Sequence, residues 1–175
     1  RILPKPIGTG IIAPAIKGDM ASESERDEIV ESMAALNDKP IEAVKKFDVN
    51  ACTDITGFGF LGHIWELASG SGVEITVQSS DIPYFDSARD YAEMGLVPEG
   101  GYNNKAHFGS EVEISSEVEE TTVDILFDPQ TSGGLLISVP SEEASDLLLE
   151  LYDLGVSEAM IIGEVTGEEP KIKLV

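Results

Sequence analysis

The first half of the chain carries apolar residues at the spacing of amphipathic helices. One predicted helix follows Ser22, which has capping-box spacing to Glu25, and its apolar face continues to Leu36. Pro40 suits the first position of a short second helix. Apolar residues at i, i+3, i+4 and i+7 across 61–68 predict a third helix, which Gly70 or Gly72 should end. Each of these segments should pack against a core on one side and face solvent on the other.

Strand patterns are concentrated further along the chain. Residues 73–77 alternate apolar and polar side chains, as a half-buried strand does. Residues 123–128 and 135–139 predict two apolar strands that are separated by a turn. Two more predicted strands cover 159–165 and 171–175. The chain therefore contains enough strands for a substantial sheet.

Other segments of the second half are interpreted as helices and loops. Residues 85–94 predict a helix that stops at Gly95. Ser141 is the predicted cap of a later helix, which Gly155 ends. Glycine and asparagine dominate 98–104, and this composition predicts a loop.

The order of these elements indicates the α+β class. We expect a mixed or antiparallel sheet with helices packed on one face, in a single domain over residues 1–175. The chain starts at Arg1, inside a predicted strand and with no lead-in segment, so we expect it to be part of a longer protein.

Composition narrows the range of partners. Lys and Arg total 11 and Asp and Glu total 33, which gives a net charge of −22. This charge repels phosphate backbones and anionic lipid, and it argues against nucleic-acid and membrane-surface partners. No apolar run approaches the roughly 18 to 20 residues of a membrane-spanning helix. One cysteine excludes an intrachain disulfide and a cysteine-rich zinc site. The sequence predicts a cytoplasmic globular domain.

The segment C-T-D-I-T-G-F-G (52–59) is the first that could carry chemistry. Asp54 lies where a predicted strand gives way to a helix, next to glycines that let a ligand approach the backbone. Such a carboxylate can hold Mg²⁺, which completes its coordination with water and substrate phosphates. The alternative is that Asp54 or Thr56 only caps the following helix, and the spacing by itself favours the cap.

The segment D-P-Q-T-S-G-G (128–134) is the second. The hydroxyls of Thr131 and Ser132, with the backbone at Gly133 and Gly134, could form an anion-binding nest. A tight loop between two strands explains the same residues, and composition favours it. The segment is not a P-loop, because no G-K-[ST] follows.

Isolated residues give weaker signals. Cys52 is expected to be a buried free cysteine and not a reactive thiol. His63 and Glu66 share a helix face, but one such pair does not make a metal site. Lys5 and Lys17 could meet phosphate, although solvated lysines are the commoner case. The residues alone do not name a reaction.

Five segments occur in a distinctive order along the chain. They are K-P-I-G-T-G-I (5–11), A-C-T-D-I-T-G-F-G-F-L-G-H (51–63), G-L-V-P-E-G (95–100), D-P-Q-T-S-G-G-L-L (128–136) and I-I-G-E-V (161–165). Together they resemble the C-terminal half of the selenophosphate synthetase (selenide, water dikinase) family. The resemblance covers nearly the whole chain.

The resemblance implies a fold and a reaction. The family belongs to a superfamily with aminoimidazole ribonucleotide synthetase, thiamine-monophosphate kinase and a hydrogenase-maturation protein, whose members pair an N-terminal ATP-binding domain with an α+β C-terminal domain. The implied reaction converts ATP, selenide and water into selenophosphate, AMP and phosphate, requires Mg²⁺ and is carried out by a homodimer.

The resemblance also implies roles for the two loops. Asp54 matches a metal ligand of the family, and Thr53, Thr56 and Gly57 would shape its loop. The second loop would form another wall of the interdomain cleft, and its residues are Thr131, Ser132, Gly133 and Gly134.

The N-terminal half of the family pattern is absent from these 175 residues. The nucleophilic cysteine or selenocysteine and its partner lysine are expected in that half, together with the sites for ATP and selenide. We therefore expect no catalytic residue in this chain, and no activity from the chain alone. Two alternatives remain open, namely another enzyme of the superfamily, such as the aminoimidazole ribonucleotide synthetase type, and a non-catalytic binding or scaffold domain.

Overall fold

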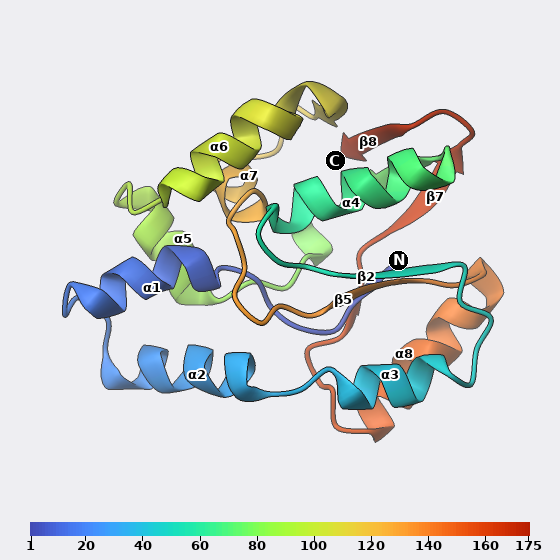
Figure 1. Cartoon of the computed structure of the whole chain (residues 1–175), viewed down its shortest axis with the longest axis horizontal. Coiled ribbons are helices and arrows are strands. Elements are labelled where there is room, and N and C mark those ends of the chain that lie inside the picture. The colour runs from blue at the N-terminus through green and yellow to red at the C-terminus, as the bar shows by residue number, and fades with distance from the viewer.

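Two four-stranded sheets form the framework of the chain, as a computed structural model of residues 1–175 shows (Figure 1). The first sheet is antiparallel and has the order β2-β5-β1-β6. Its strands are β1 (Ile2–Leu3), β2 (Ala51–Asp54), β5 (Leu135–Ser138) and β6 (Met160–Ile161). The second sheet is mixed and has the order β4-β8-β3-β7. Its strands are β3 (Glu74–Val77), β4 (Val112–Ile114), β7 (Gly163–Gly167) and β8 (Lys171–Leu174).

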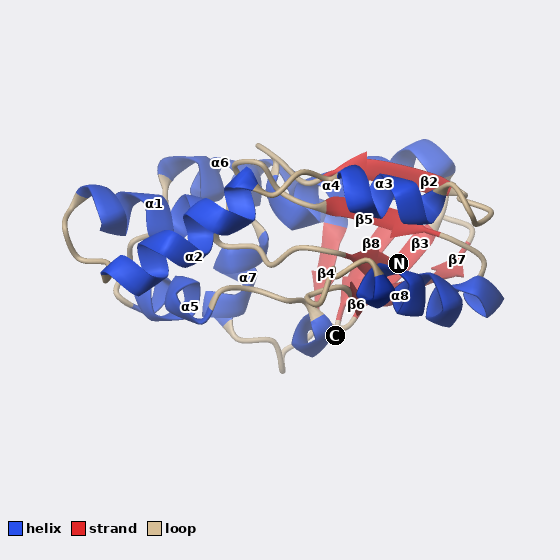
Figure 2. Cartoon of the chain, turned by 90° about the horizontal axis from the view of Figure 1, so that it is seen from below, coloured by secondary structure: helices blue, strands red, loops and turns tan.

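Helices surround the sheets and form one end of the molecule. They are α1 (Thr9–Lys17), α2 (Glu23–Ala34), α3 (Asp38–Val44), α4 (Gly59–Ser71), α5 (Asp86–Glu93), α6 (Glu99–Phe108), α7 (Glu120–Leu126) and α8 (Ala144–Asp153). In Figure 2, α1, α2, α5, α6 and α7 gather at one end, and the strands lie at the other. None of the helices has the length and apolarity that crossing a bilayer requires.

The first sheet buries apolar side chains on both of its faces. Successive residues of a strand point to opposite sides, so Ile2 and Ile137 join a cluster with Leu147 and Leu151 of α8. Leu3 belongs to the larger core of 29 buried residues. The α+β class is confirmed, and the strands are divided between two sheets, which the hydrophobic pattern did not separate.

Several predicted boundaries are confirmed by local geometry. The backbone N–H of Ser22 donates to Glu25 Oε2 at 2.6 Å, and the Glu25 N–H donates to Ser22 Oγ at 3.3 Å, so the capping box is present. Helix α4 ends at Gly72, whose φ is 68°, and Gly95, with φ 83°, follows α5. These positive φ angles are readily adopted only by glycine.

Other predictions were wrong. Residues 98–104 are not a loop, because α6 begins at Glu99, and residues 123–128 are mostly helix α7 and not a strand. Helix α8 is preceded by a 3₁₀ turn and has Glu143 at its N-cap, so Ser141 does not cap it. Pro40 is the third residue of α3 and not the first.

Candidate functional site

The two predicted loops lie side by side at one end of the first sheet. Strand β2 ends at Asp54, and its antiparallel neighbour β5 begins at Leu135, which is paired with Asp54 (Figure 1). The backbone N–H of Ile55 donates to Gly134 O at 2.9 Å, and the N–H of Gln130 donates to Thr56 O at 2.9 Å. Segments some 80 residues apart in the sequence therefore form one surface.

Asp54 is an exposed carboxylate that no hydrogen bond ties to the rest of the chain. Helix α4 has Phe58 at its N-cap and no side-chain cap, and the Thr56 hydroxyl pairs with His63 instead. The interpretation of Asp54 or Thr56 as a helix cap is therefore wrong. No three His, Cys, Asp or Glu side chains are grouped as metal ligands in this chain. An exposed carboxylate such as that of Asp54 is able to supply one ligand to a metal ion.

The glycines of the two loops differ in what they are needed for. A Cβ at Gly133 would collide with the carbonyl oxygen of Ile55, and one at Gly134 would lie 2.9 Å from Lys5 Cβ. These two glycines are buried and allow close packing. Gly57 is exposed, does not have a positive φ, and has open space where a Cβ would lie. The fold does not require glycine at position 57, so the space above it is available to a ligand.

The second loop caps helix α1 with a buried side chain. Gln130 Oε1 accepts hydrogen bonds from Gly8 N at 2.9 Å, Thr9 N at 3.2 Å and Thr9 Oγ1 at 3.1 Å. The hydroxyl of Thr9 in turn accepts from Thr131 N at 3.0 Å. The N–H groups at the start of a helix have no acceptors within the helix. For α1, the second loop supplies the acceptor, which is Gln130 Oε1. No pattern in the sequence marked Gln130 as a functional residue.

Asp128 completes this cap. Its side chain is fully buried, and Oδ2 accepts from Gly10 N at 2.9 Å and from Gln130 Nε2 at 2.9 Å. Burial raises the pKa of Asp128 to about 7, and the hydrogen bonds from Gln130 and the start of α1 oppose this shift. Thr131 and Ser132 remain exposed, and neither hydroxyl is hydrogen-bonded within the chain.

Asn104 joins the two loops to α6, a role that its sequence context did not predict. Its Nδ2 donates to Gly57 O at 2.9 Å and to Phe127 O at 3.0 Å, and the residue is 8% exposed. The only sequence signal was the G-L-V-P-E-G segment (95–100), which leads into α6.

Lys5 is neither solvated nor free to meet phosphate. Its Nζ donates to Ser32 O at 3.0 Å, Ala35 O at 2.6 Å and Ser132 O at 3.1 Å. Desolvation lowers the pKa of this buried lysine. Lys5 therefore ties the end of α2 to the second loop, whereas Lys17 is exposed and has no ion-pair partner in the chain.

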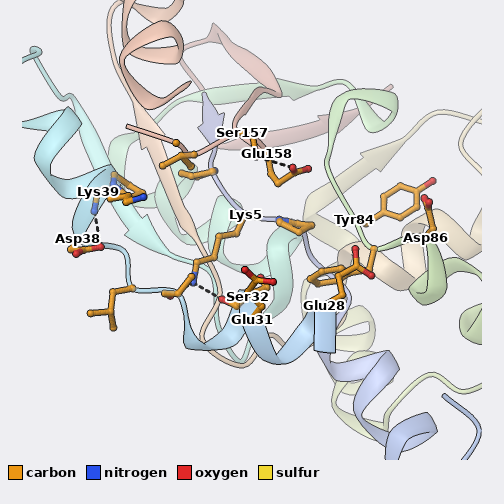
Figure 3. Close-up of a pocket in the computed structure, with 18 residues that line it drawn as sticks. Lys5, Glu28, Glu31, Ser32, Asp38, Lys39, Tyr84, Asp86, Ser157 and Glu158 are labelled. Atoms are coloured by element: carbon orange, nitrogen blue, oxygen red, sulfur yellow. Dashed lines mark hydrogen bonds between the residues drawn. The ribbon is translucent and has the colours of Figure 1, made fainter. Parts of the chain in front are cut away.

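A groove of about 760 Å³ runs past Lys5 (Figure 3). Carboxylates from several elements line it, namely Glu28, Glu31, Asp38, Asp86 and Glu158. Phosphate is repelled by such a lining. The groove does not include Asp54 or residues 128–134, so it is not the predicted site.

Cys52 is exposed on the edge strand β2, contrary to the expected burial. Desolvation of the thiol, and then the charge of Asp54, raise the pKa of Cys52. The thiolate, which is the reactive form, is therefore disfavoured.

Comparisons with known proteins agree with this architecture. Residues 2–174 match the family model described as "AIR synthase related protein, C-terminal domain". The chain is 48% identical over 174 residues to selenide, water dikinase 2 of Peptoclostridium acidaminophilum, covering 99% of the chain and 50% of that protein. It is 44% identical over 174 residues to a selenide, water dikinase of Pelobacter propionicus, with the same coverage of both. The chain thus spans about half the length of the curated relatives it matches.

Solved structures share the fold at low sequence identity. The hydrogenase maturation protein HypE of E. coli superposes with a TM-score of 0.68 at 19% identity, covering 99% of this chain and 45% of HypE. Thiamine monophosphate kinase of Aquifex aeolicus gives a TM-score of 0.59 at 16% identity, covering 99% of this chain and 48% of that protein. At this identity, the likeness concerns the fold alone.

Proposed function

Since the chain belongs to the family of AIR synthase related proteins, as their C-terminal domain, we propose that it is the C-terminal half of a selenide, water dikinase. The whole protein would convert ATP, selenide and water into selenophosphate, AMP and phosphate. The observation that carries this proposal is the 48% identity to one such enzyme across 99% of the chain.

Asp54 is the residue of this chain that we assign to Mg²⁺. Its carboxylate is exposed and free of hydrogen bonds, and the space above Gly57 is open. Mg²⁺ typically uses one or two carboxylates together with water and substrate phosphates, so a single carboxylate fits. The other protein ligands would come from outside this chain, because no acidic group of three is present here. When bound, Mg²⁺ would neutralise charge on the phosphates during phosphoryl transfer.

The charge of the chain supports a metal-binding role for this half and a nucleotide-binding role for the N-terminal half. A domain with a net charge of −22 repels ATP unless cations lie between the carboxylates and the phosphates. ATP and selenide would bind mainly through the N-terminal half, which would also carry the cysteine or selenocysteine and the lysine. Thr53, Thr131 and Ser132 would line the cleft between the two halves, in a cytoplasmic homodimer.

The test is selenide-dependent AMP formation by the full-length protein, with selenophosphate detected by ³¹P NMR. Asp54→Asn should lower kcat/KM about 10³-fold, or ~4 kcal/mol of transition-state stabilisation, because one metal contact is lost. Asp153→Asn is the matched control, since Asp153 is an exposed carboxylate on α8 that forms no hydrogen bond through its side chain. Near-normal turnover of Asp54→Asn would remove Asp54 from the metal site.

The 175-residue chain alone should form no AMP from ATP and selenide. It would lack the nucleophile and most of the metal ligands. The same ³¹P assay, run with the isolated chain at the concentration used for the full-length protein, measures this. Selenide-dependent AMP formation by the isolated chain would contradict the proposed division between the two halves.

A further inference from the structure

His63 lies behind the Asp54 loop and contacts it through one ring nitrogen. His63 is 8% exposed on α4, and its Nε2 lies 3.1 Å from Thr56 Oγ1 and 3.4 Å from Phe58 N. The other nitrogen, Nδ1, lies 3.3 Å from Oε2 of Glu66. The imidazole and Phe58 rings are also in contact, with centroids 5.4 Å apart. One buried side chain thus contacts both ends of the turn at residues 56–58.

The hydrogen-bond pattern fixes the tautomer of His63. A backbone N–H can only donate, so the Nε2 atom that accepts from Phe58 N carries a lone pair. The proton of the neutral imidazole is then on Nδ1, on the side of the Glu66 carboxylate. The Thr56 hydroxyl then donates to the same Nε2, and the two donors share its single lone pair in a three-centre hydrogen bond. The lone pairs of the hydroxyl are consequently left free of the imidazole.

No other group of the chain makes these two contacts. The carbonyls of the turn are held from other elements, since Thr56 O accepts from Gln130 N and Gly57 O accepts from Asn104 Nδ2. The Thr56 hydroxyl and the Phe58 N–H have only His63 as a partner, and α4 has no other side-chain cap. The turn is also closed by its own bond from Gly59 N to Thr56 O, so the imidazole adds the only contacts that the Thr56 hydroxyl and the Phe58 N–H make.

We propose that His63 is a positioning residue, which holds the Thr56–Phe58 turn beside Asp54 in the conformation that Mg²⁺-bound nucleotide requires. The catalytic part of this inference rests on the proposed function. The turn begins two residues after Asp54, where β2 ends, and contains the open position at Gly57, so a displaced turn would close or shift the surface on which the ligand rests. Holding the turn in this way requires a hydrogen-bond acceptor at the place of Nε2, whichever side chain supplies it.

Two substitutions separate this role from simple packing. In His63→Gln, the terminal amide reaches the place of Nε2 and can accept there, whereas in His63→Asn the shorter amide reaches only the place of Nδ1. We expect His63→Asn to lower kcat/KM of the full-length protein about tenfold or more, as for a lost hydrogen bond of ordinary strength. His63→Gln should recover activity to within about threefold of wild type by the same reasoning. Equal losses in the two variants would overturn the proposal.

A second pair of variants tests the Thr56 hydroxyl, which is the partner of His63. These two variants leave the packing of residue 63 unchanged. Thr56→Val removes the hydroxyl at nearly constant volume, and Thr56→Ser retains it. Thr56→Val should lower activity more than Thr56→Ser does. In the His63→Asn background, Thr56→Val should add no further loss, because the effects of coupled residues are not additive. Full additivity of the two losses would overturn the coupling.

Hydrogen–deuterium exchange distinguishes failure of this inference from failure of the proposed function. In the full-length protein, the peptide covering residues 54–61 should exchange faster in His63→Asn and at the wild-type rate in His63→Gln. This measurement needs no substrate. If the wild-type protein forms no AMP with selenide, the proposed function fails, and the exchange result still decides whether His63 holds the turn. Unchanged exchange in His63→Asn would overturn its positioning role.

Discussion

Replacing Gln130 by alanine should destabilise the chain more than loop substitutions usually do. The side chain is 6% exposed, and its amide satisfies Gly8 N, Thr9 N, Thr9 Oγ1 and the buried Asp128. Each buried polar group left without a partner costs about 1–3 kcal/mol. Water entering the vacated space would satisfy some of these groups, so the expected loss in the free energy of unfolding is about 3–5 kcal/mol. This is a large part of the roughly 5–15 kcal/mol of a typical domain.

Urea unfolding of the chain, followed by circular dichroism, measures this loss. Thermal unfolding should show a decrease in Tm of about 10 °C. The chain offers a matched control, because Gln78 is an exposed glutamine whose side chain has no hydrogen bond. Gln78→Ala should change the free energy of unfolding by less than about 0.5 kcal/mol. A loss below about 1 kcal/mol for Gln130→Ala would mean that the second loop does not cap α1 as described.

The glutamate variant tests the orientation of the Gln130 amide. Nε2 donates to Asp128 O at 2.7 Å and to Asp128 Oδ2 at 2.9 Å. Gln130→Glu replaces this donor by a second carboxylate oxygen, and like charges at such a distance repel. The glutamate variant should therefore be less stable than Gln130→Ala above about pH 7, where Asp128 is ionised, and should recover in acid. The opposite order above that pH would show that Nε2 does not face Asp128.

Two further predictions concern the same end of the sheet. The Asp128 carboxyl has a pKa of about 4 in the unfolded chain and about 7 in the folded chain. Its contribution to the free energy of unfolding is therefore complete below about pH 4 and is lost as the pH rises through about 7. Unfolding of wild type and Asp128→Asn from pH 4 to 8 should thus diverge by up to about 4 kcal/mol, and parallel curves would contradict the burial effect. Gly133→Ala should cost at least about 1–3 kcal/mol because its Cβ would collide with the Ile55 carbonyl, whereas Gly57→Ala should be neutral within about 0.5 kcal/mol in the same urea assay. Equal losses for the two glycines would contradict the open space at Gly57.

Local signals in the sequence were sufficient for the helices that have their own caps. Helix α2 follows a complete capping box, and α4 combines an apolar face with a terminal glycine at position 72. Such signals act within a few residues of the element, so the sequence expresses them directly. The end of β2 at Asp54 was predicted because the strand pattern gives way there to nearby glycines and a helix. The same signal placed the Asp54 carboxylate of the candidate site at the strand end.

Elements that depend on distant partners could not be predicted in this way. Helix α6 contains two glycines and two asparagines, yet Gly100 packs close to Pro129, and Asn104 donates to Gly57 O and Phe127 O. These tertiary contacts override poor helix propensity. The run at 123–128 is short and apolar, and periodicity cannot separate a buried strand from a buried helix at that length.

The candidate site shows the same division. Both of its loops were predicted from their residue types. Gln130 and Asn104 instead bond to groups far away in the sequence, and His63 bonds to the Asp54 loop through its side chain alone. Their roles depend on which backbone groups lie nearby, for example the Gly8 and Thr9 N–H groups that face Gln130. No spacing in the sequence encodes that proximity.

The central place of β1 in the first sheet has a consequence for synthesis on the ribosome. Strand β1 lies between β5 and β6, so the residues at 2–3 pair with residues near 137 and 160–161. Contacts of such long range are slow to form. Until residues 135–138 and 160–161 have left the exit tunnel, β1 lacks the two strands that flank it in the folded domain. Protection of this segment during translation would then fall to chaperones or to the helices already made.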